Sequence, residues 1–182
     1  MSTLIVQNPS DTRDVVGEHA VMTADEIAQV IAAARDAFAG WRATSTQQRA
    51  DLLDRIGSTL LARSSELGRE LSREEGKTLA EGVGEVTRAG QIFKFFAVEA
   101  VRLSGRSGAS TRPGIEVGTR CEPAGVFGLI TPWNFPIAIP AWKLAPALAF
   151  GNCAVLKPSE FTPGMALQLK AIADQAGLPP GV

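Results

Sequence analysis

One short stretch of the sequence carries most of the side chains that could do chemistry. It runs from Ile130 to Glu160, is apolar and rich in proline, and still holds polar residues at definite places. The side-chain NH2 of Asn134 could be turned toward a developing oxyanion, and a preorganised donor of this kind lowers a barrier by about 3–4 kcal/mol. On spacing alone, a plain asparagine helix cap after a turn explains the residue better.

Three further polar residues, Lys157, Ser159 and Glu160, end this stretch. Lys157 could bond ribose hydroxyls or pair with a phosphate, and Glu160 could accept from ribose hydroxyls, as an acidic residue past a strand does in dinucleotide sites. A surface ion pair between Lys157 and Glu160, three residues apart, explains them at least as well. Lys143, inside the apolar part, is expected to extend its amine to the surface.

Two short apolar segments must position these side chains. Residues 125–131 form a continuous apolar run, typical of a strand buried on both faces, and residues 153–157 form a second strand. A small-residue helix to about Phe150 separates them. A last helix follows with Thr162 as N-cap and Pro163 at its first position. This β-α-β-α order predicts an α/β fold with a parallel sheet.

The carboxyl ends of parallel strands meet at one edge of a sheet, where ligands bind. Asn134 comes just after the first expected strand and at the start of a helix. Lys157, Ser159 and Glu160 come at the end of the second strand. The order of the segments therefore predicts that these residues cluster at one rim.

The preceding residues predict helices. Capping boxes at Thr23–Glu26 and Ser45–Gln48 begin two of them. The first has an apolar face that continues to Trp41, and the second, longer one carries Leu53 to Leu71. A third should run from about Thr78 to Leu103. Three glycines fall inside it: Gly82, Gly84 and Gly90. Each costs about 1 kcal/mol against alanine, so packing must compensate, and the glycines could mark close approach of neighbouring elements.

Residues 104–122 lack any helical period. The stretch SGRSGASTRPGIEVGTR holds four glycines and alternating short apolar positions, which predicts a loop and a hairpin-like arm. Such an arm often finds its partner strand on another chain. An ordinary surface hairpin fits the pattern about as well.

Composition excludes several classes of protein. The 182 residues suit one domain with a sizeable core. Eighteen basic residues oppose nineteen acidic ones without a block of like charge, which argues against nucleic acid and anionic membranes as partners. Cys121 and Cys153 fit neither a disulfide framework nor a zinc site, so no metal is expected and a cytoplasmic location is favoured. No signal peptide is read, and the apolar run over 135–150 is too short for a membrane span.

Longer motifs resemble a known family. PWNFP at 132–136, PAWKLAPALAFGN at 140–152 and LKPSE at 156–160 are similar to the aldehyde dehydrogenase superfamily of NAD(P)-dependent enzymes. QQRADLLDRIGSTLLARSSEL resembles the N-terminal helices of that family, so the resemblance covers essentially the whole chain. The stretch EEGKTLAEGVGEVTRAGQIFKFFAVEAVRLSG further resembles members acting on α-ketoglutaric semialdehyde.

The resemblance implies a role for each site residue. Asn134 matches the asparagine whose amide forms the oxyanion hole with a backbone N–H of the catalytic cysteine. Lys157 and Glu160 match the pair that grips the adenosine ribose. Ser159 would leave room for a 2′-phosphate, which Glu160 would repel, so NAD and NADP both stay open as cofactors. The segment lining the cofactor cleft is matched by Ile130, Thr131, Pro132 and Trp133.

The resemblance also implies how the chain is organised. Residues 1–103 would be the N-terminal helical part of the cofactor-binding domain, residues 104–122 an oligomerisation arm, and residues 123–182 an incomplete Rossmann-like part. Leu178 to Val182 would only begin a third parallel strand, and two parallel strands with open edges make a poor core. We therefore expect a truncated chain from which the catalytic domain is absent.

The chemistry of the family needs residues that these motifs do not supply. In that family a cysteine thiolate attacks the aldehyde, and the resulting thiohemiacetal passes hydride to the nicotinamide. A glutamate then activates water. The resemblance places this cysteine and this glutamate in later sequence. Cys121 and Cys153 are expected to be structural, and the only histidine, His19, is distant in sequence.

Two functions stay open. The first is the N-terminal part of a homo-oligomeric enzyme that oxidises an aldehyde, with α-ketoglutaric semialdehyde as a candidate, to a carboxylate. On its own this chain would be inactive. The second is a non-catalytic short chain that binds nucleotide weakly or associates with full-length subunits through the arm.

Overall fold

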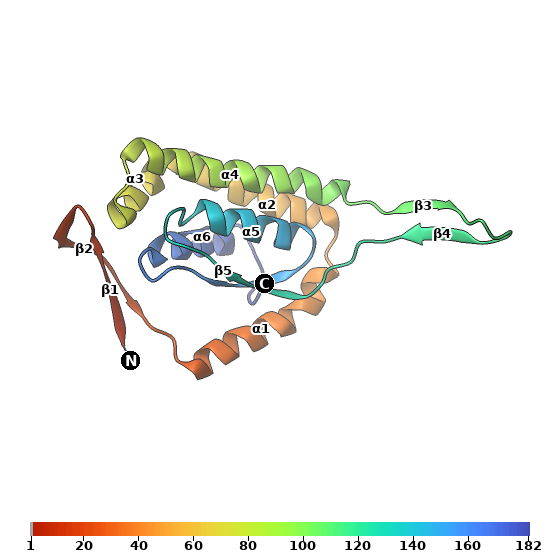
Figure 1. Ribbon diagram of the computed structural model, residues 1–182, viewed down its shortest axis with the longest axis horizontal. Coiled ribbons are helices and arrows are strands. Elements are labelled where there is room, and N and C mark those ends of the chain that lie inside the picture. The colour runs from red at the N-terminus through yellow and green to blue at the C-terminus, as the bar shows by residue number, and fades with distance from the viewer. Residues whose placement is uncertain (1) are drawn as a thin grey trace.

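The computed structural model describes residues 2–182, which fold into a layered arrangement of helices and short strands (Figure 1). In chain order the elements are β1 (Thr3–Asn8), β2 (Asp11–Ala20), α1 (Ala24–Arg42), α2 (Thr46–Ala62), α3 (Ser64–Glu75), α4 (Leu79–Arg102), β3 (Arg106–Ala109), β4 (Glu116–Thr119), β5 (Val126–Ile130), α5 (Ala138–Ala149), β6 (Cys153–Lys157) and α6 (Pro163–Gln175).

The two predicted capping boxes are confirmed. The Thr23 side chain accepts from the Glu26 backbone N–H while the Glu26 carboxylate accepts from the Thr23 N–H, and Ser45 and Gln48 repeat this pattern. These bonds satisfy backbone donors that the first helical turn leaves free. Helices α1 and α2 therefore begin where the sequence placed them.

The single long helix predicted through Leu53 and Leu71 is wrong. The chain turns at Arg63, whose ψ of 11° is not helical, and α3 starts again at Ser64. Leucines on both sides of the turn are fully buried, so the turn keeps the apolar face on the core while α3 changes direction.

The strand pair lies between two groups of helices. Figure 1 shows α2 and α4 stacked along one side, α5 and α6 inside them, and α1 across the opposite face of the β5–β6 pair. A single cluster of buried apolar side chains joins these layers. Its largest fully buried members include Leu53, Ile56, Leu60, Phe93, Ile137, Leu148, Leu169 and Ile172.

The predicted parallel pairing is confirmed. Strands β5 and β6 run parallel in a register that begins with Val126 opposite Cys153 and ends with Ile130 opposite Lys157. The expectation that β5 is buried on both faces is wrong, because Phe127 is 42% exposed and Ile130 72% exposed. Within residues 2–182 β5 pairs only with β6, and α1 packs more closely on β6 than on β5.

The end of the described chain does not begin a third strand. Residues 180–181 form a turn, and the Val182 backbone N–H donates to the Pro179 carbonyl at 3.2 Å. Pro179 and Pro180 lack the N–H that a sheet ladder needs. Val182 instead packs into the core.

Two hairpins extend from opposite ends of the body (Figure 1). Strands β3 and β4 pair antiparallel, and every residue of both strands is exposed, so the hairpin-like arm is confirmed as a local structure. At the other end, β2 is tied to α3 by the Asp14 carboxylate, which accepts from the Arg73 guanidinium. The Arg73 and Asn8 donors lower the pKa of Asp14 to about 2.

Helix α2 holds the C-terminal ends of two other helices. Arg49 donates from Nε to the Ala149 carbonyl at 2.9 Å, at the end of α5, and is 5% exposed. The exposed Arg55 donates from Nε to the Ala176 carbonyl at 3.0 Å, just past α6. Helix C-termini leave carbonyls unpaired and carry partial negative charge, so both arginines complement them.

No helix within residues 2–182 combines the length and the apolar character needed to cross a membrane.

Candidate functional site

The parallel strands bring the two halves of the predicted site to one edge. Ile130 and Lys157 are the last paired residues of β5 and β6. Directly beyond them, the Thr131 backbone N–H donates to the Lys157 carbonyl at 3.2 Å. The segment that leads to Asn134 therefore starts beside the residue that leads to Glu160.

The residues at the end of β5 make an exposed, mostly apolar rim. Ile130 and Trp133 are 72% and 52% exposed, and Pro132 is exposed as well. Thr131 is the exception, because it is 4% exposed and its Oγ1 has no hydrogen-bond partner among residues 2–182. Exposed apolar side chains and a buried unpaired hydroxyl at a strand end are features of a surface that binds a ligand or another protein segment.

Asn134 does not cap a helix. Helix α5 begins at Ala138 with Ile137 as its N-cap, so Asn134 precedes the helix by four residues, and the helix-cap interpretation is wrong. Asn134 is exposed, and its backbone carbonyl accepts from Lys77 Nζ at 3.1 Å. Its backbone is thus anchored while its side-chain amide is free to act as a donor.

Lys157 and Glu160 form the surface ion pair that their spacing allows. Lys157 Nζ lies 3.5 Å from Glu160 Oε2, and the two side chains are 63% and 61% exposed. A backbone N–H donor and the neighbouring Lys157 lower the pKa of the Glu160 carboxyl. An exposed pair of this kind contributes little stability, so both side chains can turn to a ligand at low cost.

Ser159, in contrast, faces inward. It is 6% exposed, and its Oγ accepts from the Phe161 backbone N–H at 3.2 Å. Its hydroxyl is therefore engaged in the turn between β6 and α6, and Lys157 and Glu160 offer the accessible polar atoms there.

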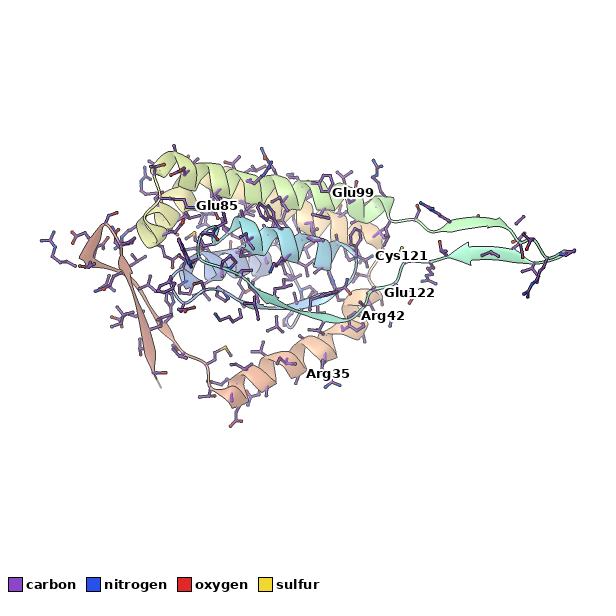
Figure 2. All side chains as sticks on the ribbon, viewed as in Figure 1. Arg35, Arg42, Glu85, Glu99, Cys121 and Glu122 are labelled. Carbon is purple, nitrogen blue, oxygen red and sulfur yellow. The ribbon has the colours of Figure 1, made fainter. Side chains whose placement is uncertain are left out.

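Sequence reasoning missed two buried glutamates that hold the helices at this edge. One Glu85 oxygen accepts from the backbone N–H groups of Ile137 and Ala138 at 3.0 and 3.1 Å, at the start of α5 (Figure 2). Glu74 does the same for α6, accepting from Gly164 and Met165 at 2.7 and 3.2 Å. Burial raises the pKa of the Glu74 carboxyl.

Lys143 is exposed, as expected, and its amine also makes a specific contact. It donates from Nζ to the Ile130 carbonyl at 2.7 Å, so the lysine of α5 satisfies a backbone group at the end of β5. The polar residue inside the apolar helix is thereby accounted for.

The two cysteines lie in different surroundings. Cys153 is fully buried, as expected for a core residue, and its burial raises the pKa of the thiol. Cys121 is exposed and is therefore not a core residue. It follows the arm beside Glu122, which pairs with Arg42 at 3.1 Å (Figure 2). Across residues 2–182, no group of three or more His, Cys, Asp and Glu side chains could hold a metal ion.

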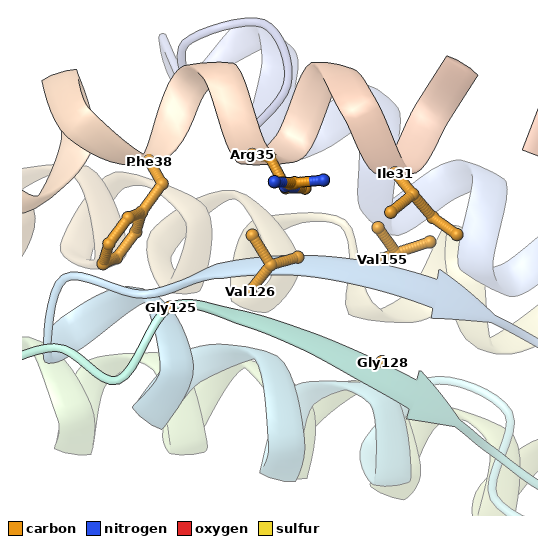
Figure 3. A pocket seen from close by; sticks show the side chains of 7 residues that line it. All are labelled: Ile31, Arg35, Phe38, Gly125, Val126, Gly128 and Val155. Carbon is orange, nitrogen blue, oxygen red and sulfur yellow. The ribbon is translucent and has the colours of Figure 1, made fainter. Parts of the chain in front are cut away.

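A separate groove of about 560 Å³ lies between α1 and the strand pair (Figure 3). Ile31, Arg35 and Phe38 reach toward it from α1, and Val126 and Val155 from the strands. None of the candidate site residues that the sequence predicted lines this groove, so the groove is distinct from the strand-end rim.

A parallel strand pair with exposed Asn134, Lys157 and Glu160 beyond its carboxyl ends has the arrangement of an α/β protein that binds a ligand at that edge. The fold as a whole supports a narrower assignment. Residues 2–182 match the sequence profile of the Aldehyde dehydrogenase family, and the chain belongs to that family.

Similar proteins include semialdehyde dehydrogenases. The chain is 44% identical over 180 residues to an alpha-ketoglutarate semialdehyde dehydrogenase of Haloferax volcanii, covering 99% of this chain and 37% of that protein. It is 41% identical to a 2,5-dioxopentanoate dehydrogenase of Saccharolobus solfataricus, covering 96% of this chain and 37% of that protein.

A solved structure shares the arrangement of the whole chain. An aldehyde dehydrogenase from Brucella melitensis biovar abortus matches with a TM-score of 0.97 and 36% identity, covering 100% of this chain and 37% of that one. This chain therefore spans little more than a third of the length of the relatives it matches.

Proposed function

We propose that residues 1–182 are the N-terminal part of an enzyme that oxidises an aldehyde to a carboxylate with NAD or NADP. The family match across residues 2–182 carries the proposal. It is supported by three polar side chains exposed beyond the parallel strands: Asn134, Lys157 and Glu160. The names of the two relatives described above support α-ketoglutaric semialdehyde as the substrate.

The strand-end rim fits a dinucleotide. Lys157 and Glu160 extend into solvent and contact each other, so both can reach ribose hydroxyls without disturbing the core. The exposed segment from Ile130 to Trp133 would line the cofactor beside them. When bound, NAD or NADP supplies the hydride acceptor. The Glu160 carboxylate disfavours a 2′-phosphate and the Lys157 ammonium favours one, so the rim is compatible with either cofactor.

Asn134 is the residue of this chain that we assign to the chemistry. Its amide would donate a hydrogen bond to the oxygen of the aldehyde as a thiolate attacks the carbon and negative charge develops there. We propose that the nucleophile comes from residues outside 1–182, because Cys153 is buried and Cys121 follows the arm.

The β3–β4 arm would join subunits. Both strands are fully exposed and present unpaired backbone edges, which are templates for pairing with another chain. We propose that it takes part in a homo-oligomer.

The role of Asn134 is tested by Asn134→Ala in the complete enzyme that carries this chain. Removing an oxyanion donor should lower kcat by about 10²–10³-fold and leave the dissociation constant of the cofactor unchanged. An unchanged kcat would refute the assignment.

The mass of the polypeptide in its source cells separates the proposal from its alternative. A product well above 19.2 kDa supports an enzyme of which this chain is the first part. A product of 19.2 kDa supports the alternative of a non-catalytic chain that binds nucleotide weakly or joins full-length subunits.

A further inference from the structure

A cluster of three charges with little exposure contacts the Asn134 segment. Lys77 Nζ is 2.7 Å from Glu75 Oε2 and 2.5 Å from Glu85 Oε2. The three side chains are only 12%, 9% and 2% exposed. Burying charges costs so much desolvation that such a cluster is weak evidence for stability. Its contacts with neighbouring residues indicate a different use.

Lys77 holds the backbone of Asn134. Its Nζ donates to the Asn134 carbonyl at 3.1 Å and lies 4.7 Å from the centroid of the Phe135 ring, in cation–π contact. The Phe135 ring in turn stacks on Trp142 of α5 at 6.4 Å. Two consecutive residues of the loop therefore contact one ammonium group, which binds Asn134 through its backbone carbonyl and not through its exposed side chain.

Glu85 fixes the other end of the same loop. One of its oxygens receives the Lys77 ammonium, and the other accepts from the backbone N–H groups of Ile137 and Ala138. A continuous chain of polar contacts thus runs from the Asn134 carbonyl through Lys77 and Glu85 to the N-terminus of α5. The five-residue span from Asn134 to Ala138 is held at both ends by one ion pair.

We propose that Lys77, held by Glu85, is a positioning residue that sets where the Asn134 amide lies during the reaction. The proposal rests on the oxyanion role proposed above for Asn134. Without the ammonium, the Asn134 peptide loses its donor and Phe135 loses its contact, so the amide no longer sits where the charge develops. Substrate and cofactor affinity should be spared, because the Lys77 side chain is only 12% exposed and contacts the Asn134 loop and not Lys157 or Glu160.

The test is Lys77→Met in the complete enzyme. A misplacement of about 1 Å costs about 10²-fold in rate, so we expect kcat to fall roughly ten- to a hundredfold. The KM for the aldehyde and the cofactor dissociation constant, measured by fluorescence titration, should stay unchanged. Lys77→Arg keeps the charge and should retain most of the activity. Lys94→Met is the matched control, because Lys94 is also buried in part and pairs with Asp54 at 2.6 Å without touching the loop.

A second variant tests whether misfolding explains a loss of activity. Lys77→Met leaves two buried carboxylates without their partner, whereas Glu75→Gln with Lys77→Met removes one charge of each sign and keeps the Glu85 contacts to α5. This double variant should keep the far-UV circular dichroism of the wild type and show the same loss of kcat. If both variants lose the native spectrum, the cluster is only a folding element and the positioning role is wrong.

Combining Lys77→Met with Asn134→Ala gives the decisive comparison. If Lys77 acts through Asn134, adding Lys77→Met to Asn134→Ala lowers kcat no further. If the two losses multiply, Lys77 acts by another route and the inference is overturned while the role of Asn134 stands. If Asn134→Ala alone leaves kcat unchanged, the oxyanion assignment fails, and the positioning role fails with it.

Discussion

Two glycines in the first turns of α4 should respond to alanine in opposite ways. Gly82 is buried, and a Cβ placed on it would lie 2.5 Å from Ser72 Oγ and against the Gly68 carbonyl of α3. Gly84, two residues later, is exposed and has no atom within 4 Å of the same position. Comparing the stability of the two alanine variants therefore separates the effect of helix propensity from the effect of helix packing.

The expected magnitudes follow from those surroundings. Alanine gains about 1 kcal/mol over glycine in a helix interior, so Gly84→Ala should raise the free energy of unfolding by about 0.4–1 kcal/mol. At Gly82 the methyl group must displace the backbone of α3. Ser72 Oγ donates to the Gly68 carbonyl at 2.9 Å, so these neighbours are held in place. Overpacking costs about 1–3 kcal/mol, and Gly82→Ala should lose stability despite its better propensity.

Urea unfolding of the purified protein, followed by tryptophan fluorescence, measures both changes. The midpoint should rise for Gly84→Ala and fall for Gly82→Ala, with an unchanged slope that shows the same surface exposed on unfolding. If Gly82→Ala is as stable as Gly84→Ala, the close approach of α3 and α4 does not depend on the missing side chain, and the reasoning is refuted.

Two further predictions concern charged groups. Arg49→Met removes the donor to the buried Ala149 carbonyl at the end of α5 and the donor to the Thr44 carbonyl, so the free energy of unfolding in urea should drop by about 1–3 kcal/mol. Arg55→Met removes an exposed donor to the Ala176 carbonyl and should cost much less; equal losses would contradict this account. The pKa of Asp14 is lowered to about 2, so the ion pair with Arg73 contributes stability above pH 4 that is lost as the pH falls toward 2. Acid unfolding followed by circular dichroism should show wild type and Asp14→Asn converging over that range, and a constant difference would contradict it.

Local signals explain what the sequence could predict. A capping box connects residues three apart, so Thr23 with Glu26 and Ser45 with Gln48 identified helix starts without any tertiary information. Strand β6 was likewise predicted with its observed bounds, because Gly151 and Pro158 punctuate it on either side. The edge position of Lys157 and Glu160 then followed from the parallel order of the segments.

Contacts distant in sequence explain what could not be predicted. Glu85 is 52 residues from Ile137, and Glu74 is 90 residues from Gly164, so no spacing rule connects them. Asn134 was similarly ambiguous, because only the placement of α5 shows that the helix starts four residues later.

The two helices that follow β5 and β6 are held in the same way at both ends. The N-termini of α5 and α6 receive the carboxylates of Glu85 and Glu74, and their C-terminal carbonyls receive the guanidinium groups of Arg49 and Arg55. Each charge opposes the partial charge of the helix end it meets. All four charged side chains come from α2, α3 and α4, so these N-terminal helices fix the orientation of α5 and α6. Since the Asn134 loop and the Lys157–Glu160 turn lead into those two helices, the geometry of the candidate site depends on residues that lie far from it in the sequence.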